Sequence, residues 1–213
     1  MKYVDCVKDL GIYMDTDMKF RTHMKKKINK ANSTMGTIKR TFKYITHDTF
    51  KMLYCANVRS QLEYGGQITC PHLKKDIIMI ERVQKKATKY LPGMKYLSYE
   101  ERLRKLDLPT LAYRRLRGAM IEVFKIFNTY DKNLVPNLQL IESQTRGHDK
   151  KLFYPRTLKD HPKQHSFNVR IVKPWNSLPP KVVNSKNVNS FKNALDTHWK
   201  NLKMKYSYLD YDF

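Results

Sequence analysis

Acidic side chains are scarce in this chain, and long apolar runs are missing from it. Its 213 residues include 19 Asp and Glu against 42 Lys and Arg, which gives a formal net charge of +23. A folded protein has little use for such an excess unless a polyanion neutralises it, so nucleic acid is the expected partner. No stretch approaches the roughly 18 consecutive apolar residues of a membrane-spanning helix, and the N-terminus lacks the apolar core of a signal peptide. We therefore expect no membrane partner.

Cysteine is rare as well. The three cysteines are odd in number and widely spaced, at Cys6, Cys55 and Cys70. This pattern argues against a disulfide framework and favours a reducing compartment. We expect an intracellular protein of the nucleus or cytoplasm that is not secreted.

One long apolar stripe near the N-terminus has the period of a helix. Its members recur at intervals of four and three residues and are Phe20, Met24, Ile28, Ala31, Met35, Ile38 and Phe42. The spacing predicts an amphipathic helix of about six or seven turns, in which Ile28, Met35 and Ile38 are buried. Gly36 weakens or breaks it near its middle.

The same segment is wholly positive away from the stripe. Residues 19–43 hold nine Lys or Arg and no Asp or Glu. A cationic helix face can contact phosphates without reading base sequence. Our candidate contacts on this helix are Lys25, Lys26, Lys27, Lys30, Lys39, Arg40 and Lys43. A long basic loop further along the chain adds Arg146, Lys150 and Lys151.

The rest of the chain also has mostly helical periodicity. Further helices are predicted over 48–63, 73–90, 98–106, 110–128 and 188–199, and Ser98 and Glu101 form a capping-box pattern. Short strands are predicted over 7–14 and 167–172, a rigid turn over 174–180, and a frayed tail over 206–213. The expected fold is mostly α, with an N-terminal strand or hairpin, a helical bundle, a long basic loop and a small C-terminal strand-plus-helix element. We expect four parts: 1–95, 96–130, 131–166 and 167–213.

Several segments in colinear order carry a family resemblance. The first is KDLGIYMDTDMKFRTHMKKKINKANSTMGTIKRTF, and later ones are VRSQLEYGGQITCPH, IERVQKKATKYLPGMKYLSYEERLRKLDLPTLAYRRLRG, SFNVRIVKPWNSLPPKVV and VNSFKNALDTHW. Together they resemble the region that follows the catalytic palm in reverse transcriptases of non-LTR (LINE-type) retrotransposons. The resemblance implies that residues 9–15 form a primer-gripping hairpin. The helices after it would form a thumb that follows the template–primer backbone.

The chain also contains a near match to a polymerase active-site box. Tyr3-Val4-Asp5-Cys6 differs by one residue from Tyr-Val-Asp-Asp, but in the family that box lies several dozen residues before the Asp-Leu-Gly strand. Nucleotidyl transfer needs two divalent metals held by carboxylates, and Cys6 offers a soft thiol where a hard oxygen ligand is required. We therefore expect no catalytic residues, no metal site and no cofactor in this chain.

These observations predict a non-catalytic piece of a retrotransposon reverse transcriptase. It would contact RNA or DNA mainly through the phosphate backbone, with little sequence specificity, and would also contact the palm domain. Two alternatives stay open at this point. The chain could be a host-encoded relic that acts as a protein-interaction module, or a truncated part of an active polymerase.

Overall fold

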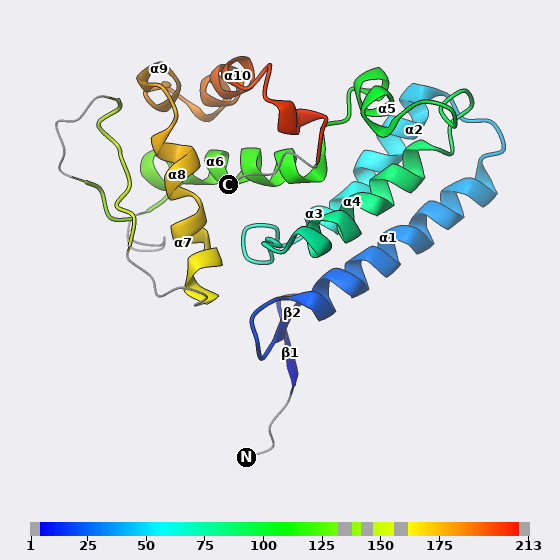
Figure 1. Ribbon diagram of the computed structural model, residues 1–213, viewed down its shortest axis with the longest axis horizontal. Helices are drawn as coiled ribbons and strands as arrows, with labels where there is room; N and C mark the ends of the chain where they lie inside the picture. Colours follow the sequence, from blue (N-terminus) through cyan, green and yellow to red (C-terminus); the bar gives the residue numbers. More distant parts are fainter. Residues whose placement is uncertain (1–4, 132–137, 142–146, 156–161, 209–213) are drawn as a thin grey trace. The chain divides into compact units, whose positions relative to one another are not determined.

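A computed structural model describes residues 5–131, 138–141, 147–155 and 162–208 (Figure 1). The fold is mostly helical, with a two-stranded antiparallel hairpin at the N-terminus, as predicted. The chain divides into two compact units. Unit 1 is Met1–Arg114 with Met204–Asp210, and unit 2 is Arg115–Lys203 with Tyr211–Phe213. Within the described ranges, no helix has the length and apolar character needed to cross a membrane.

The N-terminal hairpin replaces the single strand predicted over 7–14. Strand β1 (Cys6–Asp9) pairs with β2 (Ile12–Asp15), and Asp9 lies opposite Ile12. The two residues between them, Leu10 and Gly11, both have positive φ, 43° and 76°. Two-residue turns of this kind match the twist of the flanking strands. The strand pattern over 7–14 did not locate this turn, because leucine rarely adopts a positive φ and the apolar pattern therefore gave no sign of it.

Helix α1 (Arg21–Thr41) follows the hairpin and runs unbroken through Gly36. Its predicted stripe faces the core: Met24, Ala31, Met35 and Ile38 are all buried, as is Phe20 just before the helix. Ile28 is only partly buried against this core, so its predicted full burial was wrong. The carboxylate of Asp15 accepts a hydrogen bond from the Thr22 amide (3.1 Å) and so satisfies one of the free N–H groups at the start of α1.

The segment predicted as one helix over 48–63 contains three consecutive helical stretches. Helix α2 (His47–Leu53) leads into a π-helical stretch, Tyr54–Arg59, and then into α3 (Ser60–Glu63). The Thr46 hydroxyl caps α2 by accepting from the Thr49 amide (3.2 Å). Helix α4 (Lys74–Thr88) follows, and these helices share one hydrophobic core with α1. That core includes Phe50, Tyr54, Val58, Leu62, Ile80, Val83 and Ala87.

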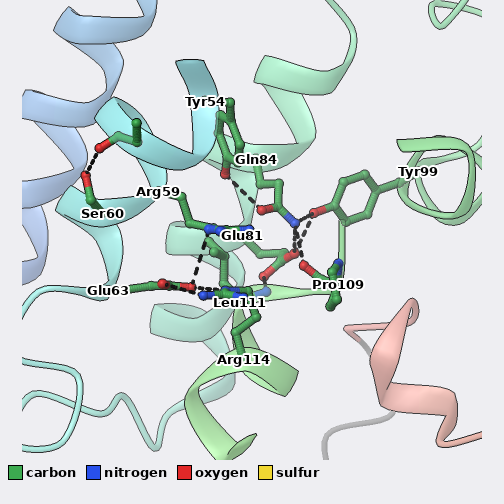
Figure 2. A network of polar contacts seen from close by, with 11 residues as sticks. Tyr54, Arg59, Ser60, Glu63, Glu81, Gln84, Tyr99, Pro109, Leu111 and Arg114 are labelled. Atoms are coloured by element: carbon green, nitrogen blue, oxygen red, sulfur yellow. Dashed lines mark hydrogen bonds and ion pairs between the residues drawn. The ribbon is translucent and has the colours of Figure 1, made fainter. Parts of the chain in front are cut away.

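A buried polar network joins α4 to three other parts of unit 1 (Figure 2). The Glu81 carboxylate, whose residue is 1% exposed, accepts hydrogen bonds from the Tyr99 hydroxyl, the Leu111 amide (3.0 Å) and the Gln84 amide (3.4 Å). The Tyr54 hydroxyl donates to Gln84 Oε1 (2.9 Å). Burial and the nearby Glu81 carboxylate raise the pKa of Tyr99, so its hydroxyl keeps its proton and remains a donor.

Helices α5 (Tyr99–Leu106) and α6 (Leu111–Asn128) begin at well-defined caps. The predicted capping box is present at α5, with Ser98 and Glu101 satisfying each other's backbone amides. At α6, the Thr110 hydroxyl accepts from the Tyr113 amide (3.1 Å) and donates to the Met204 carbonyl (2.7 Å). This second bond holds the residue 204–208 segment on unit 1.

The tail is ordered over the part that the structure describes. Tyr206 and Tyr208 pack against the unit 1 core, and Tyr208 meets the Tyr99 ring edge-on at 5.7 Å between centroids. The prediction of a frayed tail from residue 206 was therefore wrong over Tyr206–Tyr208, because these rings bury apolar surface there. Residues 209–213 lie outside the described residues.

Unit 2 is organised around Trp175, which is fully buried. Its ring lies near Phe127 and Phe191, at centroid distances of 5.8 and 6.1 Å, and its indole N–H donates to the Lys150 carbonyl (2.8 Å). The neighbouring Asn176 exchanges two hydrogen bonds with the backbone of Leu152 (2.8 and 2.9 Å). These bonds anchor the described part of the basic loop, which includes a bridge between Leu140 and Leu152.

The C-terminal strand predicted over 167–172 is helical instead. Helices α7 (Phe167–Arg170) and α8 (Val172–Asn176) occupy that region, followed by α9 (Pro180–Val183) and α10 (Val188–His198). The predicted turn over 174–180 shrinks to residues 177–179. Val169, Val172 and Trp175 are all buried, and their three-residue spacing puts them on one helix face. Packing on that face outweighed the preference of Val169, Ile171 and Val172 for a strand.

The stripe of α1 generates a first prediction. Ile38→Ala should lower the free energy of unfolding by about 2–5 kcal/mol, because it removes buried methylene groups and leaves a cavity. Lys30→Ala, on the exposed face of the same helix, should change it by less than about 0.5 kcal/mol. Urea unfolding followed by circular dichroism measures both values. Equal losses would contradict the assigned orientation of α1.

The network around Glu81 generates a second prediction. Glu81→Ala should destabilise the protein by about 3 kcal/mol or more, because the Tyr99 and Leu111 donors would be buried without an acceptor. Glu100→Gln removes an exposed carboxylate from α5 and should cost less than about 1 kcal/mol. Thermal and urea unfolding compare the two variants. A Glu81→Ala protein as stable as Glu100→Gln would show that the network contributes little.

Candidate nucleic-acid interface

Most of the predicted phosphate contacts on α1 are exposed. Lys25, Lys26, Lys30, Lys39 and Arg40 are exposed on the helix, and Lys43 is exposed just after it. Helical geometry places Lys26, Lys30 and Arg40 opposite the buried stripe. No ion pair between described residues involves any of these side chains. Within the described residues, their positive charge is therefore not neutralised by a carboxylate in an ion pair.

Two tyrosine rings contact the first turns of α1. The ammonium of Lys26 lies 3.8 Å from the centroid of the Tyr13 ring, and Lys8 lies 5.6 Å from the same ring. Lys27 lies 3.8 Å from the Tyr64 ring. Such cation–π contacts fix the ammonium groups in place at a modest energetic gain. The N-terminal end of α1 therefore presents ordered cations beside aromatic rings.

Lys27 differs from its neighbours because it is partly buried. Burial lowers the pKa of its ammonium, the Tyr13 ring opposes this, and the positive charge of Lys8 lowers it further. Lys27 therefore differs from the other predicted phosphate contacts on α1. It packs against Tyr64 and helps to hold the hairpin end of the structure together. Tyr64 also donates from its hydroxyl to the Leu10 carbonyl in the hairpin turn (2.7 Å).

His23, at the N-terminal end of α1, is buried, which the sequence did not predict. It is 2% exposed, its Nδ1 accepts from the Tyr13 amide, and its Nε2 donates to the Tyr64 carbonyl, both at 3.4 Å. Because the Tyr13 amide can only donate, the ring must be neutral with its proton on Nε2. Burial lowers the pKa of His23, the bond to Tyr64 opposes this, and Lys27 lowers it further. His23 therefore links hairpin, α1 and the residues after α3 in its neutral form.

One cation at the other end of α1 lies beside a different tyrosine. Lys39 lies 5.3 Å from the centroid of the Tyr90 ring. The Tyr90 hydroxyl donates to the Phe42 carbonyl (2.6 Å) and so ties the end of α1 to the residues after α4. Arg40 lies within reach of the Thr37 hydroxyl (3.4 Å) and is otherwise exposed.

The candidates of the basic loop belong to unit 2. Lys150 donates from its ammonium to Asn128 Oδ1 (3.2 Å), and Lys151 is partly buried, with its carbonyl accepting from Ile141 (2.9 Å). Arg146 lies outside the described residues. The structure thus brings the predicted contacts of α1 together on one helix and places Lys150 and Lys151 in the other compact unit.

Two carboxylates near the hairpin, those of Asp15 and Asp17, are engaged with the chain itself. Burial opposes ionisation of Asp15, but hydrogen bonds from Thr22 and Arg21 outweigh it, so the pKa of Asp15 is lowered. Asp17 accepts from the Lys19 amide (3.0 Å) and pairs with its ammonium (3.2 Å). Among the described residues, no three His, Cys, Asp or Glu side chains are grouped so as to hold a metal ion. The arrangement supports binding of an anion by charge and ring contacts.

Three side chains of this interface were missed at the sequence level. Lys8 lies in a strand outside the cationic helix, His23 reads as one more polar residue of α1, and Tyr64 is 54 residues from the Leu10 carbonyl that it bonds. Two glycines, Gly65 and Gly66, follow Tyr64, but nothing in the sequence indicated which part of the chain this segment meets. Comparison of the chain with protein-family models, curated proteins and solved structures found no match.

The state of His23 generates a third prediction. An unfolded histidine has a pKa of about 6.5, and the folded value is lower, so neutral His23 contributes stability above about pH 6.5. This contribution is lost as pH falls through the folded pKa. His23→Gln keeps an acceptor and a donor but does not titrate. Its free energy of unfolding should therefore fall less between pH 7 and pH 5 than that of the wild type.

Urea unfolding at several pH values measures this difference. Some acid sensitivity should persist in the variant, because burial also lowers the pKa of His148 in unit 2. Parallel pH profiles for the two proteins would mean that His23 is not held in its neutral form by folding.

Proposed function

We propose that this protein binds RNA or DNA through the exposed cationic face of α1, without catalysing a reaction. The observation that carries the proposal is a row of exposed cations, none of which forms an ion pair with a described residue: Lys25, Lys26, Lys30, Lys39, Arg40 and Lys43. Residues 18–47 contain no Asp or Glu, so this surface carries a strong positive potential. The phosphates of a nucleic-acid backbone are a partner of the opposite charge.

The colinear motifs support a more specific proposal. Together with the hairpin that precedes α1, they make this chain a candidate for the thumb and following region of a non-LTR retrotransposon reverse transcriptase. In that role, α1 would follow the template–primer backbone, and the hairpin would lie beside the primer. Binding would depend little on sequence, because phosphate contacts carry no base identity.

One observation favours a protein contact at the hairpin end. Val7, Leu10 and Met18 are apolar and exposed by 53%, 84% and 52%. Exposed apolar side chains gathered near one element mark a surface that another protein can cover. We propose that a palm domain contacts the hairpin there, while the cationic face of α1 stays available to nucleic acid.

The cationic face generates a fourth prediction. In a variant with Lys25, Lys26 and Lys30 all changed to Gln, affinity for an RNA–DNA hybrid should fall at low salt. The log–log dependence of affinity on salt should become shallower by about two units, because each lost phosphate contact accounts for roughly 0.7–0.9. Lys27 is left unchanged because it supports Tyr64. Fluorescence anisotropy over a series of salt concentrations measures the slope.

A matched control variant has the same net charge as the α1 variant but loses its lysines from unit 2. Lys181, Lys186 and Lys200 are exposed in unit 2, and changing all three to Gln should leave the slope close to that of the wild type. Circular dichroism confirms that each variant is folded. Equal changes in both variants would mean that net charge alone drives binding, and an unchanged slope in the α1 variant would move the interface elsewhere.

A further inference from the structure

Two tyrosine rings stand out at the end of unit 1 where α1 and α4 both finish. Tyr44 is 94% exposed and Tyr96 is 91% exposed. The other tyrosines near the cationic helix are engaged: Tyr13 lies under Lys26, and Tyr90 donates its hydroxyl to Phe42. Phenolic rings usually bury their apolar area. The rings of Tyr44 and Tyr96 therefore leave most of their surface open to a planar group from outside the chain.

The segments that carry these rings are held beside each other. Helices α1 and α4 run in the same direction, so that their C-terminal ends lie at the same end of the bundle (Figure 1). The hydrogen bond from the Tyr90 hydroxyl to the Phe42 carbonyl (2.6 Å) ties the chain just after α1 to the chain just after α4. Tyr44 lies two residues beyond Phe42, and Tyr96 lies six beyond Tyr90.

The charge around both rings has a single sign. Residues 39–46 and 82–98 contain no Asp or Glu. Each tyrosine follows directly after an exposed lysine, Lys43 or Lys95, and the Lys95 ammonium lies 6.0 Å from the Tyr96 ring. Cations at helix C-termini also stabilise the helix dipole, but that role gives no reason to keep two aromatic rings in solvent. Each open ring thus has a lysine next to it in the sequence. A strand of nucleic acid likewise has a phosphate next to each base.

We infer that this end of unit 1 binds single-stranded nucleic acid, with unpaired bases stacked on Tyr44 and Tyr96 and the adjacent phosphates near Lys43 and Lys95. The inference rests on the proposed function and narrows its ligand. In a duplex, both faces of each internal base are covered by its neighbours, whereas unpaired bases can stack on aromatic side chains. The cationic face of α1 binds the phosphates of a duplex or of a single strand. The two tyrosines add affinity only for unpaired bases.

The test uses three probes of equal strand length at one salt concentration: a blunt RNA–DNA hybrid, a single strand, and a hybrid with a single-stranded overhang. In the double variant Tyr44→Leu, Tyr96→Leu, affinity for the single strand and the overhang probe should fall at least about tenfold, since stacking contributes roughly fivefold to hundredfold per base. Affinity for the blunt hybrid should stay within about twofold. The double variant Tyr44→Phe, Tyr96→Phe keeps the rings and should bind all three probes like the wild type.

A second pair of exposed rings serves as the matched control. Tyr130 and Tyr154 in unit 2 are 39% and 45% exposed, and changing both to Leu should not weaken binding to the single strand. Equal weakening in this control, or equal weakening on the blunt hybrid, would overturn the inference.

Failure of the proposed function would look different. If the wild type bound none of the probes, both the cationic interface and the stacking inference would be wrong. If it bound all three and the Leu variant at Tyr44 and Tyr96 bound the single strand as tightly, only the stacking inference would be wrong. Because both residues are almost fully exposed, the variants should keep the circular dichroism and unfolding midpoint of the wild type.

Discussion

Unit 1 depends on the buried carboxylate of Glu81. A carboxylate removed from water is costly unless its oxygens are fully hydrogen-bonded. Two of the donors come from distant parts of the chain, Tyr99 at the start of α5 and the Leu111 amide at the start of α6, and the third is Gln84, one turn along α4. The N-terminal end of α6 also carries the positive end of its helix dipole, which favours an acidic group there. These elements therefore have one arrangement that satisfies Glu81.

That constraint extends to the cationic surface. Gln84 accepts from Tyr54 (2.9 Å), so the network includes the π-helical stretch Tyr54–Arg59, and Glu63 at the end of α3 is held by Arg114 of α6 (Figure 2). Helix α1 packs on the apolar surface that these helices form together, burying Ala31 and Met35. Its opposite face, with Lys26 and Lys30, then points to solvent. The buried stripe of α1 thus orients its basic face, and the Glu81 network holds the helices on which that stripe packs.

Local patterns predicted most of this fold, and contacts between distant residues account for the errors. The stripe of α1 and the capping box at Ser98 and Glu101 are encoded within a few turns of helix, so the sequence alone revealed them. The hairpin turn at Leu10-Gly11 was missed because its positive φ at Leu10 is supported by Tyr64, whose hydroxyl holds the Leu10 carbonyl from 54 residues away. The region of α7 and α8 was misassigned because burial around Trp175 is a tertiary effect. For the interface, the sequence indicated which cations face away from the stripe, but not that Lys27 and His23 support the hairpin end.

The exposed charges of α1 work against folding and so call for another explanation. Like charges at positions i and i+4, such as Lys26 and Lys30, destabilise a helix by a few tenths of a kcal/mol per pair. The net charge of +23 adds repulsion over the whole chain. The ring of Tyr13 offsets part of this cost at Lys26, whereas Lys30 has no such contact on the described part of the chain. Glutamates would be equally good helix formers at the exposed positions and would relieve the repulsion by pairing with the remaining lysines. Fold stability therefore does not explain why the exposed face of α1 carries only positive charges. Counterion release on binding a polyanion would explain it.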